Sequence, residues 1–339
     1  MTTVLKGAVI GCGFFAQNHL RAWGDVRGAN LAAVCDLDAA KAEAAAALTG
    51  ATAYTDIDAM LAAESLDFLD VATTMETHER LVEKAAAASV HVICQKPFAP
   101  DLEGVRRILA TCERAGIRVM IHENFRFQAP LIALKDAVAS IGAPFFAHIS
   151  FRTGFDVVKG QPYLAEVERF IVLDLGIHVL DVARFLLGDV TDLYARTQRT
   201  MPGAAGEAQA TMSLRHQSGA VSEVVCTYTN RIEPDPFPQT LVDVEGTNGS
   251  LLLKADYRLE CHRSGSMTVQ DVSPRAPAWA DPQWAMVQES VLNTQQHFAD
   301  CLRSGAEFQT SGRDNAKTFA LVEAAYASAA SGQPVVPDR

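Results

Sequence analysis

Several features are scarce or missing in this 339-residue chain, and each absence argues against a class of protein. Lys and Arg number 29 against 40 Asp and Glu, a formal charge of −11, so a broad basic surface for nucleic acid or anionic lipid is not expected. No apolar run reaches the roughly 18 residues of a membrane span, and the N-terminus lacks the basic flank and cleavage site of a secretory signal. We expect a soluble, cytoplasmic protein.

The seven cysteines are odd in number, widely spread and without a Cys-x-x-Cys pair. Such spacing argues against a zinc site or a redox-active disulfide, so free thiols are expected. Low-complexity linkers and internal repeats are also missing. Hydrophobic residues make up 49% of the sequence, which excludes a disordered chain and suffices for the cores of two ordinary domains.

The first third of the chain alternates short apolar runs with Ala-rich helical stretches. This alternation is typical of parallel strands joined by right-handed helical crossovers. We therefore predict an α/β fold in which residues 1–123 form a doubly wound, parallel Rossmann sheet. The expected strands are 7–11, 31–36, 68–72, 91–94 and 118–121, and the expected helices are 39–48, 77–89 and 102–115.

The pattern changes after residue 123, and residues 124–339 are predicted to form a substrate-binding and oligomerisation domain of α+β type. Alternating polar and apolar segments with turn residues between them predict a large, open, mainly antiparallel sheet. Its open face favours a homodimer or homotetramer. The expected strands are 145–151, 208–215, 220–228, 240–245, 250–253 and 257–262, with helices at 130–140, 174–187, 288–303 and 312–330 and an irregular loop of about twenty residues after position 152.

A glycine-rich turn follows the first expected strand, with the pattern G-x-G-x-x-A. Gly11 permits a tight turn, Gly13 lets backbone amides approach a pyrophosphate, and Ala16 allows the next helix to pack on the sheet. Asp36 lies at the end of the second expected strand, where a carboxylate accepts ribose hydroxyls and repels a 2′-phosphate. The predicted cofactor is NAD, held by a turn that includes Phe14 and Phe15. The alternative is a glycine turn in another doubly wound fold, with Asp36 capping the next helix.

Two further clusters carry groups suited to proton transfer. Lys96, in Cys94-Gln95-Lys96-Pro97, follows a strand and is expected at the carboxyl edge of the sheet, beside the cofactor. If residues 174–181 are helical, Asp174, His178 and Asp181 share one face.

If the reaction takes hydride from an alcohol carbon, a base must remove the hydroxyl proton. His178 is the favoured base, because an unperturbed imidazole is mostly neutral at pH 7, whereas an unperturbed lysine would require about 4.6 kcal/mol to lose its proton. Lys96 then stabilises the developing alkoxide and Asp174 orients the imidazole or substrate hydroxyls. The roles of Lys96 and His178 are reversed if the lysine is strongly desolvated. A metal site is the alternative, since carboxylates and an imidazole on one helix face could bind zinc or manganese. Asp181 is interpreted as structural.

Together, the glycine turn, the Lys-Pro pair and the Asp-Gly-x-His helix resemble the Gfo/Idh/MocA family of sugar and polyol dehydrogenases across essentially the whole chain. The resemblance implies metal-free, NAD-dependent oxidation of a small aldose at its anomeric carbon, giving a lactone. Gln95 stands where the family usually has Glu, so a role for that glutamate does not transfer. The implied cofactor contacts beyond the glycine turn are Thr73, Thr74, His78, Gln95, Lys96 and Asn124, and the implied sugar ligands beside Lys96, Asp174 and His178 are Arg126, Arg152, Gln161 and Tyr163.

Other functions remain open at this point. A polyol, inositol or sugar-acid dehydrogenase would use the same groups. An enzyme that oxidises and then reduces its substrate on tightly held NAD would catalyse isomerisation or glycoside cleavage. A dinucleotide-binding sensor is the alternative from another class, but a sensor needs no proton-transfer group such as Lys96 or His178.

Overall fold

The computed structural model describes residues 4–338, which divide into two compact units. The first contains the chain up to Asn124 together with Val291–Ala316, and the second contains Phe125–Ser290 and the chain from Lys317 onward. The first unit is therefore discontinuous in sequence, whereas the sequence predicts a continuous segment 1–123. Helices α9 (Ala285–Ser304) and α10 (Gly312–Ser331) each contribute residues to both units.

The first unit is built on a six-stranded sheet in which every pairing is parallel and the strand order is β3-β2-β1-β4-β5-β6. This order defines the doubly wound Rossmann fold, so the predicted fold class is confirmed for this unit. Strand β3, which was not expected from the sequence, is short and mostly exposed and so has no apolar run to indicate it. The strands are β1 (Leu5–Ile10), β2 (Ala29–Cys35), β3 (Thr52–Tyr54), β4 (Phe68–Val71), β5 (His91–Gln95) and β6 (Val119–His122).

Aspartate caps begin three of the helices in this unit. The carboxylates of Asp38, Asp56 and Asp101 accept backbone N–H groups in the first turns of α2, α3 and α5, which satisfies donors that have no partner inside the helix. The helices are α1 (Ala16–Trp23), α2 (Ala39–Thr49), α3 (Ile57–Ala63), α4 (His78–Ala87) and α5 (Leu102–Ala115), and a 3₁₀ turn, η1 (Met75–Thr77), precedes α4.

The second unit is built on an eight-stranded sheet in the order β14-β13-β12-β11-β7-β10-β9-β8. Its pairs are antiparallel except β7 with β10, which confirms the predicted open, mainly antiparallel sheet. Two strands were missed: β14 is exposed along its whole length, and β8 alternates only in part. The strands are β7 (Pro144–Arg152), β8 (Val190–Gln198), β9 (Gln209–His216), β10 (Val221–Thr227), β11 (Leu241–Gly246), β12 (Gly249–Lys254), β13 (Arg258–Arg263) and β14 (Ser266–Asp271).

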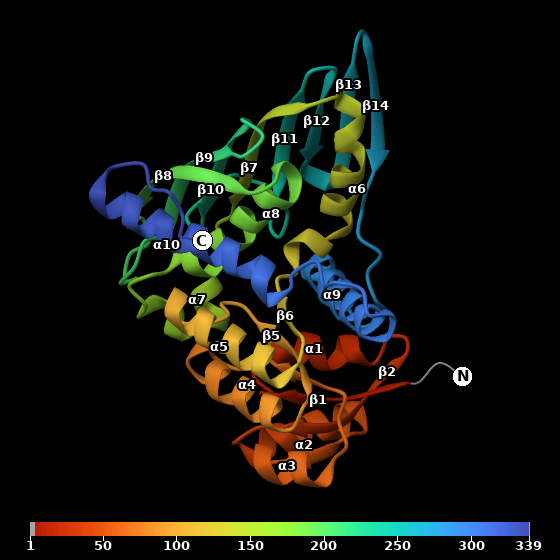
Figure 1. The fold of residues 1–339 in the computed structure, drawn as a ribbon. Helices are drawn as coiled ribbons and strands as arrows, with labels where there is room; N and C mark the ends of the chain where they lie inside the picture. The colour runs from red at the N-terminus through yellow and green to blue at the C-terminus, as the bar shows by residue number, and fades with distance from the viewer. Residues whose placement is uncertain (1–3, 339) are drawn as a thin grey trace. The chain divides into compact units, whose positions relative to one another are not determined.

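Side chains alternate across this sheet as its sequence predicts. In β9, Ala210, Met212 and Leu214 are buried while Thr211 and Ser213 are exposed. Helices α6 (Ala129–Val138) and α8 (Ile177–Leu187) pack on the sheet and on each other (Figure 1). The remaining turns are η2 (Phe125–Phe127), η3 (Ala139–Ile141), α7 (Val157–Gly160), η4 (Pro162–Ala165), η5 (Val172–Gly176) and η6 (Ala255–Tyr257).

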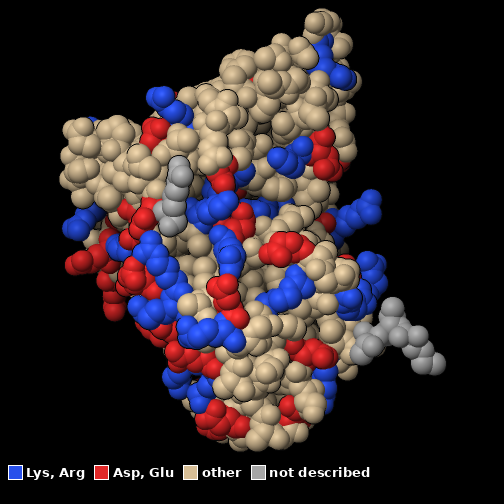
Figure 2. Space-filling model, viewed as in Figure 1, with Lys and Arg blue, Asp and Glu red and all other residues tan. Residues whose placement is uncertain are grey.

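The character of the helices and the distribution of surface charge both agree with the composition. Across residues 4–338, none of the helices combines the length and apolar character that crossing a membrane requires. On the face drawn in Figure 2, Lys and Arg side chains are interspersed with Asp and Glu rather than gathered in one extended basic area.

Candidate active site

The glycine turn has the backbone geometry that a dinucleotide requires. Gly11 has φ +90°, and a Cβ built there would lie 2.7 Å from the carbonyl oxygen of Ala72, so a larger residue is excluded. A Cβ built at Gly13 would have no atom within 4 Å, which leaves open space above the turn. The turn connects β1 to α1, whose first N–H groups favour an anion. These residues fit the pyrophosphate of NAD.

Asp36 is fixed beside this turn by backbone donors. Its Oδ2 accepts the N–H of Cys12 at 2.7 Å, and its Oδ1 accepts the N–H of Asp38 at 2.9 Å. Burial and the nearby carboxylate of Asp36 raise the pKa of the Cys12 thiol to about 12, so this thiol is a packing group at neutral pH. Phe14 is exposed on the turn, and Phe15 packs edge-on against His19.

The residues after β4 are held by side chains that contact one another and nearby backbone carbonyls. The Oγ1 atoms of Thr73 and Thr77 lie 2.7 Å apart, and Thr74 is exposed. The ring of His78 is fully buried, with its nitrogens facing the carbonyl oxygens of Thr73 and Phe98, each at 3.2 Å. Burial lowers the pKa of His78. This placement gives His78 a structural role in the loop beside the cofactor turn.

Gln95 ends strand β5 and Lys96 follows it at the carboxyl edge of the parallel sheet, where this fold places its ligands. The Oε1 of Gln95 accepts the backbone N–H of Lys96 at 2.7 Å. Lys96 is partly exposed, whereas Asn124, after β6, is 3% exposed. The first unit thus collects the predicted cofactor residues along the carboxyl ends of its strands.

Asp174 lies in the second unit, in a π-helical turn, η5, that leads directly into α8. The phenol of Tyr228 donates to Asp174 Oδ2 at 2.8 Å, and burial together with this carboxylate raises the pKa of Tyr228 well above its ordinary value. The ring of His178 is 6% exposed and stacks on Phe125, with centroids 4.1 Å apart and planes 5° from parallel. The imidazole and the carboxylate are therefore held by aromatic partners from outside their helix.

A buried carboxylate secures the start of the π-turn. Glu207 Oε1 accepts the backbone N–H groups of Phe170 and Val172, at 3.1 and 3.3 Å, and the hydroxyl of Tyr326 at 2.7 Å. The Tyr326 oxygen in turn accepts the N–H of Leu173 at 3.2 Å. π-Turns within helices are frequent at functional sites, and here four hydrogen bonds fix the turn that contains Asp174.

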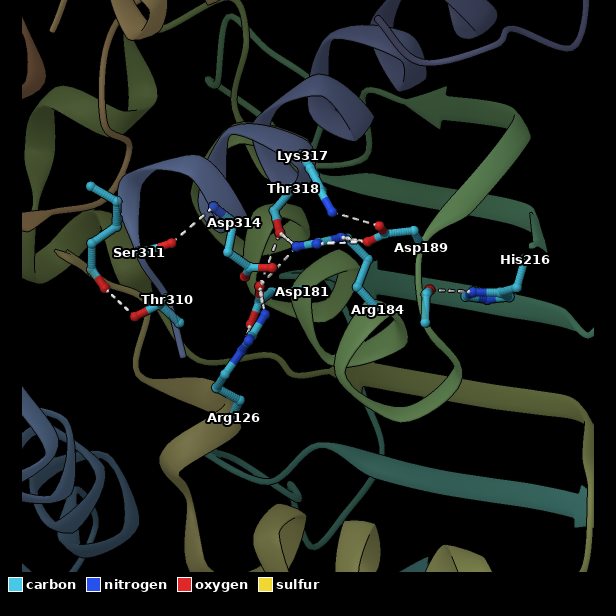
Figure 3. A network of polar contacts seen from close by, with 12 residues as sticks. Arg126, Asp181, Arg184, Asp189, His216, Thr310, Ser311, Asp314, Lys317 and Thr318 are labelled. Atoms are coloured by element: carbon cyan, nitrogen blue, oxygen red, sulfur yellow. Dashed lines mark hydrogen bonds and ion pairs between the residues drawn. The ribbon is translucent and has the colours of Figure 1, made fainter. Parts of the chain in front are cut away.

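Asp181, farther along α8, forms a buried ion pair. Its carboxylate accepts Arg126 Nε at 2.7 Å and the Thr318 hydroxyl at 2.9 Å, and Arg184 bridges Thr318 and Asp189 (Figure 3). Arg126 is 7% exposed and Asp181 is fully buried. The guanidinium that the sequence predicts to bind sugar is therefore engaged in the packing of α8, because Asp181 neutralises it there.

The other predicted sugar ligands lie in the segment after β7. Arg152 and Tyr163 are exposed and Gln161 is partly exposed, with the Tyr163 hydroxyl donating to Gln161 Oε1 at 3.1 Å. Arg169 instead pairs with Glu323 and lies over the ring of Tyr326. Within residues 4–338, no group of three or more His, Cys, Asp and Glu side chains could hold a metal ion.

Sequence reasoning missed Tyr228, Glu207 and Tyr326. No local motif marks them, because they reach the π-turn from the segments before β9 and after β10 and from α10. The available signal for Glu207 was a charged residue next to the apolar strand segment that starts at Ala208.

Two family models match most of the chain. One describes an oxidoreductase family with an NAD-binding Rossmann fold and matches residues 5–123; the other is the GFO/IDH/MocA C-terminal domain and matches residues 132–252. The chain belongs to the Gfo/Idh/MocA family of oxidoreductases. The predictions of this family, of a Rossmann domain and of NAD as cofactor are confirmed.

Within this family, the chain is similar over nearly its full length to several individual proteins. The chain is 52% identical to the D-apiose dehydrogenase of Rhizobium rhizogenes, covering 98% of this chain and 97% of the relative, and 53% identical to that of Paraburkholderia graminis, covering 98% and 90%. A solved oxidoreductase from Agrobacterium radiobacter, in complex with NAD⁺, L-tartaric acid and magnesium, is 52% identical with a TM-score of 0.97 and covers 98% of each chain.

Proposed function

We propose that this chain is an NAD-dependent dehydrogenase that oxidises D-apiose at its anomeric carbon to the lactone. The observation that carries the proposal is the identity of 52% and 53%, over almost the whole chain, to two D-apiose dehydrogenases. The residues support it independently, since Asp36 and the glycine turn fit NAD and Lys96, Asp174 and His178 supply the groups that alcohol oxidation needs. The segments 123–127, 151–156 and 160–164 also resemble D-apiose dehydrogenases.

The proposed roles follow from the chemistry of each group. His178 accepts the proton of the reacting hydroxyl, and Phe125 keeps its ring plane fixed by stacking. Lys96 stabilises the negative charge that develops on the oxygen. Asp174, oriented by Tyr228, binds substrate hydroxyls or the imidazole. When bound, NAD accepts the two electrons and the hydrogen from the anomeric carbon.

Arg152, Gln161 and Tyr163 are the proposed contacts to the remaining sugar hydroxyls. Their side chains are wholly or partly exposed and offer both donors and acceptors, which a polyol requires. Arg126 is left out of this set because Asp181 occupies its guanidinium.

The proposal is tested by following NADH absorbance while D-apiose, common aldoses, inositols and sugar acids are offered with NAD or NADP. We expect the highest kcat/KM with D-apiose and NAD. A higher kcat/KM with an inositol or sugar acid would replace the proposed substrate within the same reaction class. NADH that forms but stays bound, with no net oxidation, would indicate the oxidation–reduction cycle, and no turnover with any sugar would favour a sensor.

Cofactor choice has its own variant. Asp36→Asn keeps the size of the side chain but removes the charge that accepts ribose hydroxyls and repels a 2′-phosphate, so we expect kcat/KM with NAD to fall about 10- to 100-fold and the preference over NADP to shrink. The matched control is Asp38→Asn, two residues on, whose carboxylate caps α2. An unchanged NAD preference in Asp36→Asn would contradict the role given to Asp36.

Assembly and location complete the proposal. One set of side chains on β9 and its neighbours is exposed along the large sheet, which supports association with further copies of this chain as a homodimer or homotetramer. Light scattering is expected to report two or four chains, and a monomer at micromolar concentration would contradict this. The cytoplasm stays the predicted location.

A further inference from the structure

The first unit contains a series of hydrogen-bonded polar side chains, most of them buried. It consists of His19 on α1, Asp70 on β4 and Gln95 on β5. Helix α1 follows the glycine turn, and β5 leads directly to Lys96. His19 and Asp70 are both 0% exposed. Titratable groups this deeply buried require partners for every polar atom, so the direction of each hydrogen bond is informative.

The backbone fixes the direction of the first link. The N–H of Lys96 can only donate, and it lies 2.7 Å from Gln95 Oε1, which therefore accepts. The amide nitrogen of Gln95 then faces His19 Nε2 at 3.1 Å. Because an amide nitrogen can only donate, His19 Nε2 must be the acceptor and carries no proton.

The second link follows from the first. With Nε2 as the acceptor, the proton of a neutral imidazole sits on Nδ1, which lies 2.9 Å from Asp70 Oδ2 and 3.1 Å from Oδ1. Trp23 Nε1 and Gln295 Nε2 also donate to Asp70 Oδ2, at 2.7 and 3.2 Å. The hydrogen bonds therefore run in one direction, from the Lys96 N–H through Gln95 and His19 to the Asp70 carboxylate, and His19 is a neutral Nδ1–H tautomer.

The opposite arrangement fails at both ends. Turning the Gln95 amide would set its nitrogen against the N–H of Lys96, two donors facing each other in a partly buried position. It would also set its oxygen against His19 Nε2, which would then need a second proton. The main chain of Lys96 thus determines the amide orientation, and the amide determines the tautomer.

We propose that Asp70, His19 and Gln95 are positioning residues that hold the main chain of Lys96 against α1, the helix that begins at the glycine turn. Glutamine at position 95, where the family usually has glutamate, allows the chain to form with a neutral imidazole. The effect on turnover rests on the proposed function of Lys96, whereas the proton assignment does not.

A carboxylate at position 95 would change the proton balance. It could accept the N–H of Lys96, but its second oxygen would face the lone pair of His19 Nε2. The link then needs one additional proton, bound either by that carboxylate or by the imidazole. The Asp70 carboxylate and the His122 ring, whose centroid is 4.1 Å away, both face the His19 ring. The added proton is lost as pH rises.

The decisive variant is Gln95→Glu. We expect the kcat of this variant to fall with rising pH, by about tenfold per pH unit above the pKa of the added proton. The pH profile of the unmodified enzyme should lack this decrease. A base such as His178 produces the opposite sign, a loss of kcat as pH falls. Gln95→Leu removes both links and should lower kcat about 100-fold at every pH, because displacing a reacting group by about 1 Å has effects of this size. NAD binding is measured beside kcat in both variants, so that a change in cofactor affinity is separated from a change in turnover.

Gln217→Glu is the matched control, since it makes the same charge change on an exposed turn of the second unit and should follow the pH profile of the unmodified enzyme. A Gln95→Glu profile equal to that of the unmodified enzyme, or full turnover in Gln95→Leu, would overturn the positioning role.

The tautomer is measured without substrate by ¹⁵N NMR of the imidazole nitrogens, with His19 assigned from the signals lost in His19→Gln. A neutral Nδ1–H ring at neutral pH is expected, and an Nε2–H or doubly protonated ring would refute the assignment. This measurement decides the proton chain even if D-apiose proves not to be the substrate.

Discussion

His178→Asn and Lys96→Ala are each expected to lower kcat by about 100-fold or more while leaving NAD affinity nearly intact. Asparagine keeps much of the volume of histidine and a hydrogen-bonding group, but it cannot take up a proton at neutral pH. Alanine at position 96 removes the only part of Lys96 that can stabilise a negative oxygen, the ammonium group. Both interactions are made in the transition state, so kcat and kcat/KM should fall together.

The measurement is steady-state kinetics with D-apiose, together with NAD binding followed by fluorescence. His148→Asn and Lys159→Ala are matched controls, because they make the same changes at a half-exposed position on β7 and at an exposed position on α7. Turnover within a few-fold of the unmodified enzyme in His178→Asn or Lys96→Ala would remove that residue from the mechanism.

The proposed division of labour also predicts how the two changes combine. If His178 and Lys96 act on one oxygen, the double variant should lose less than the product of the two single losses, because groups that act as a unit are not additive. Independent losses would indicate that the two side chains act in separate steps.

Asp181→Asn should lower the free energy of unfolding by about 3–5 kcal/mol. Asp181 is fully buried and neutralises Arg126, which is itself 7% exposed. The substitution removes the negative charge that Asp181 places against this buried guanidinium, and breaking a buried pair in this way costs more than the pair contributes. Thermal denaturation should show a lower midpoint, by on the order of 10 °C.

Two further variants separate charge from packing. Asp189→Asn removes a partly exposed partner of Arg184 and Lys317 and should cost about 1 kcal/mol or less. Combining Asp181→Leu with Arg126→Met replaces the pair by apolar side chains and should recover much of the loss, since no lone charge remains. An Asp181→Asn midpoint equal to that of the unmodified protein would show that the stability of the fold does not depend on the charge of Asp181.

The elements of the fold that depend on local pattern were predictable. Apolar runs such as 68–72 and the Asp-capped helices carry their signal within a few residues, because burial on both faces and helix capping act over short sequence distances. Strand β14 and the short strand β3 escaped prediction, since an exposed strand shows no alternation and is stabilised by its neighbours.

The residue types of the candidate site were predictable from the sequence, but the side chains that position them were not. Gly11, Asp36, Lys96 and His178 stand out because their chemistry is unusual for the segments they occupy. Tyr228 gives no such signal, and its contact with Asp174 joins β10's end to the π-turn. The spacing of Asp174 and Asp181 assumes an α-helix, whereas Asp174 lies in η5, a π-turn with more residues per turn.

By itself, the sequence determined the parallel sheet of the first unit, the preference for NAD, the family and the groups capable of proton transfer. These depend on local backbone geometry and on the chemistry of single side chains, both of which follow from residues close together in the sequence. Only the tertiary structure decided that Val291–Ala316 belongs to the first unit, that Arg126 is neutralised by Asp181, and that His19 links Asp70 to Gln95. Each of these joins segments far apart in the sequence, and such contacts exist only once the strands and helices have packed.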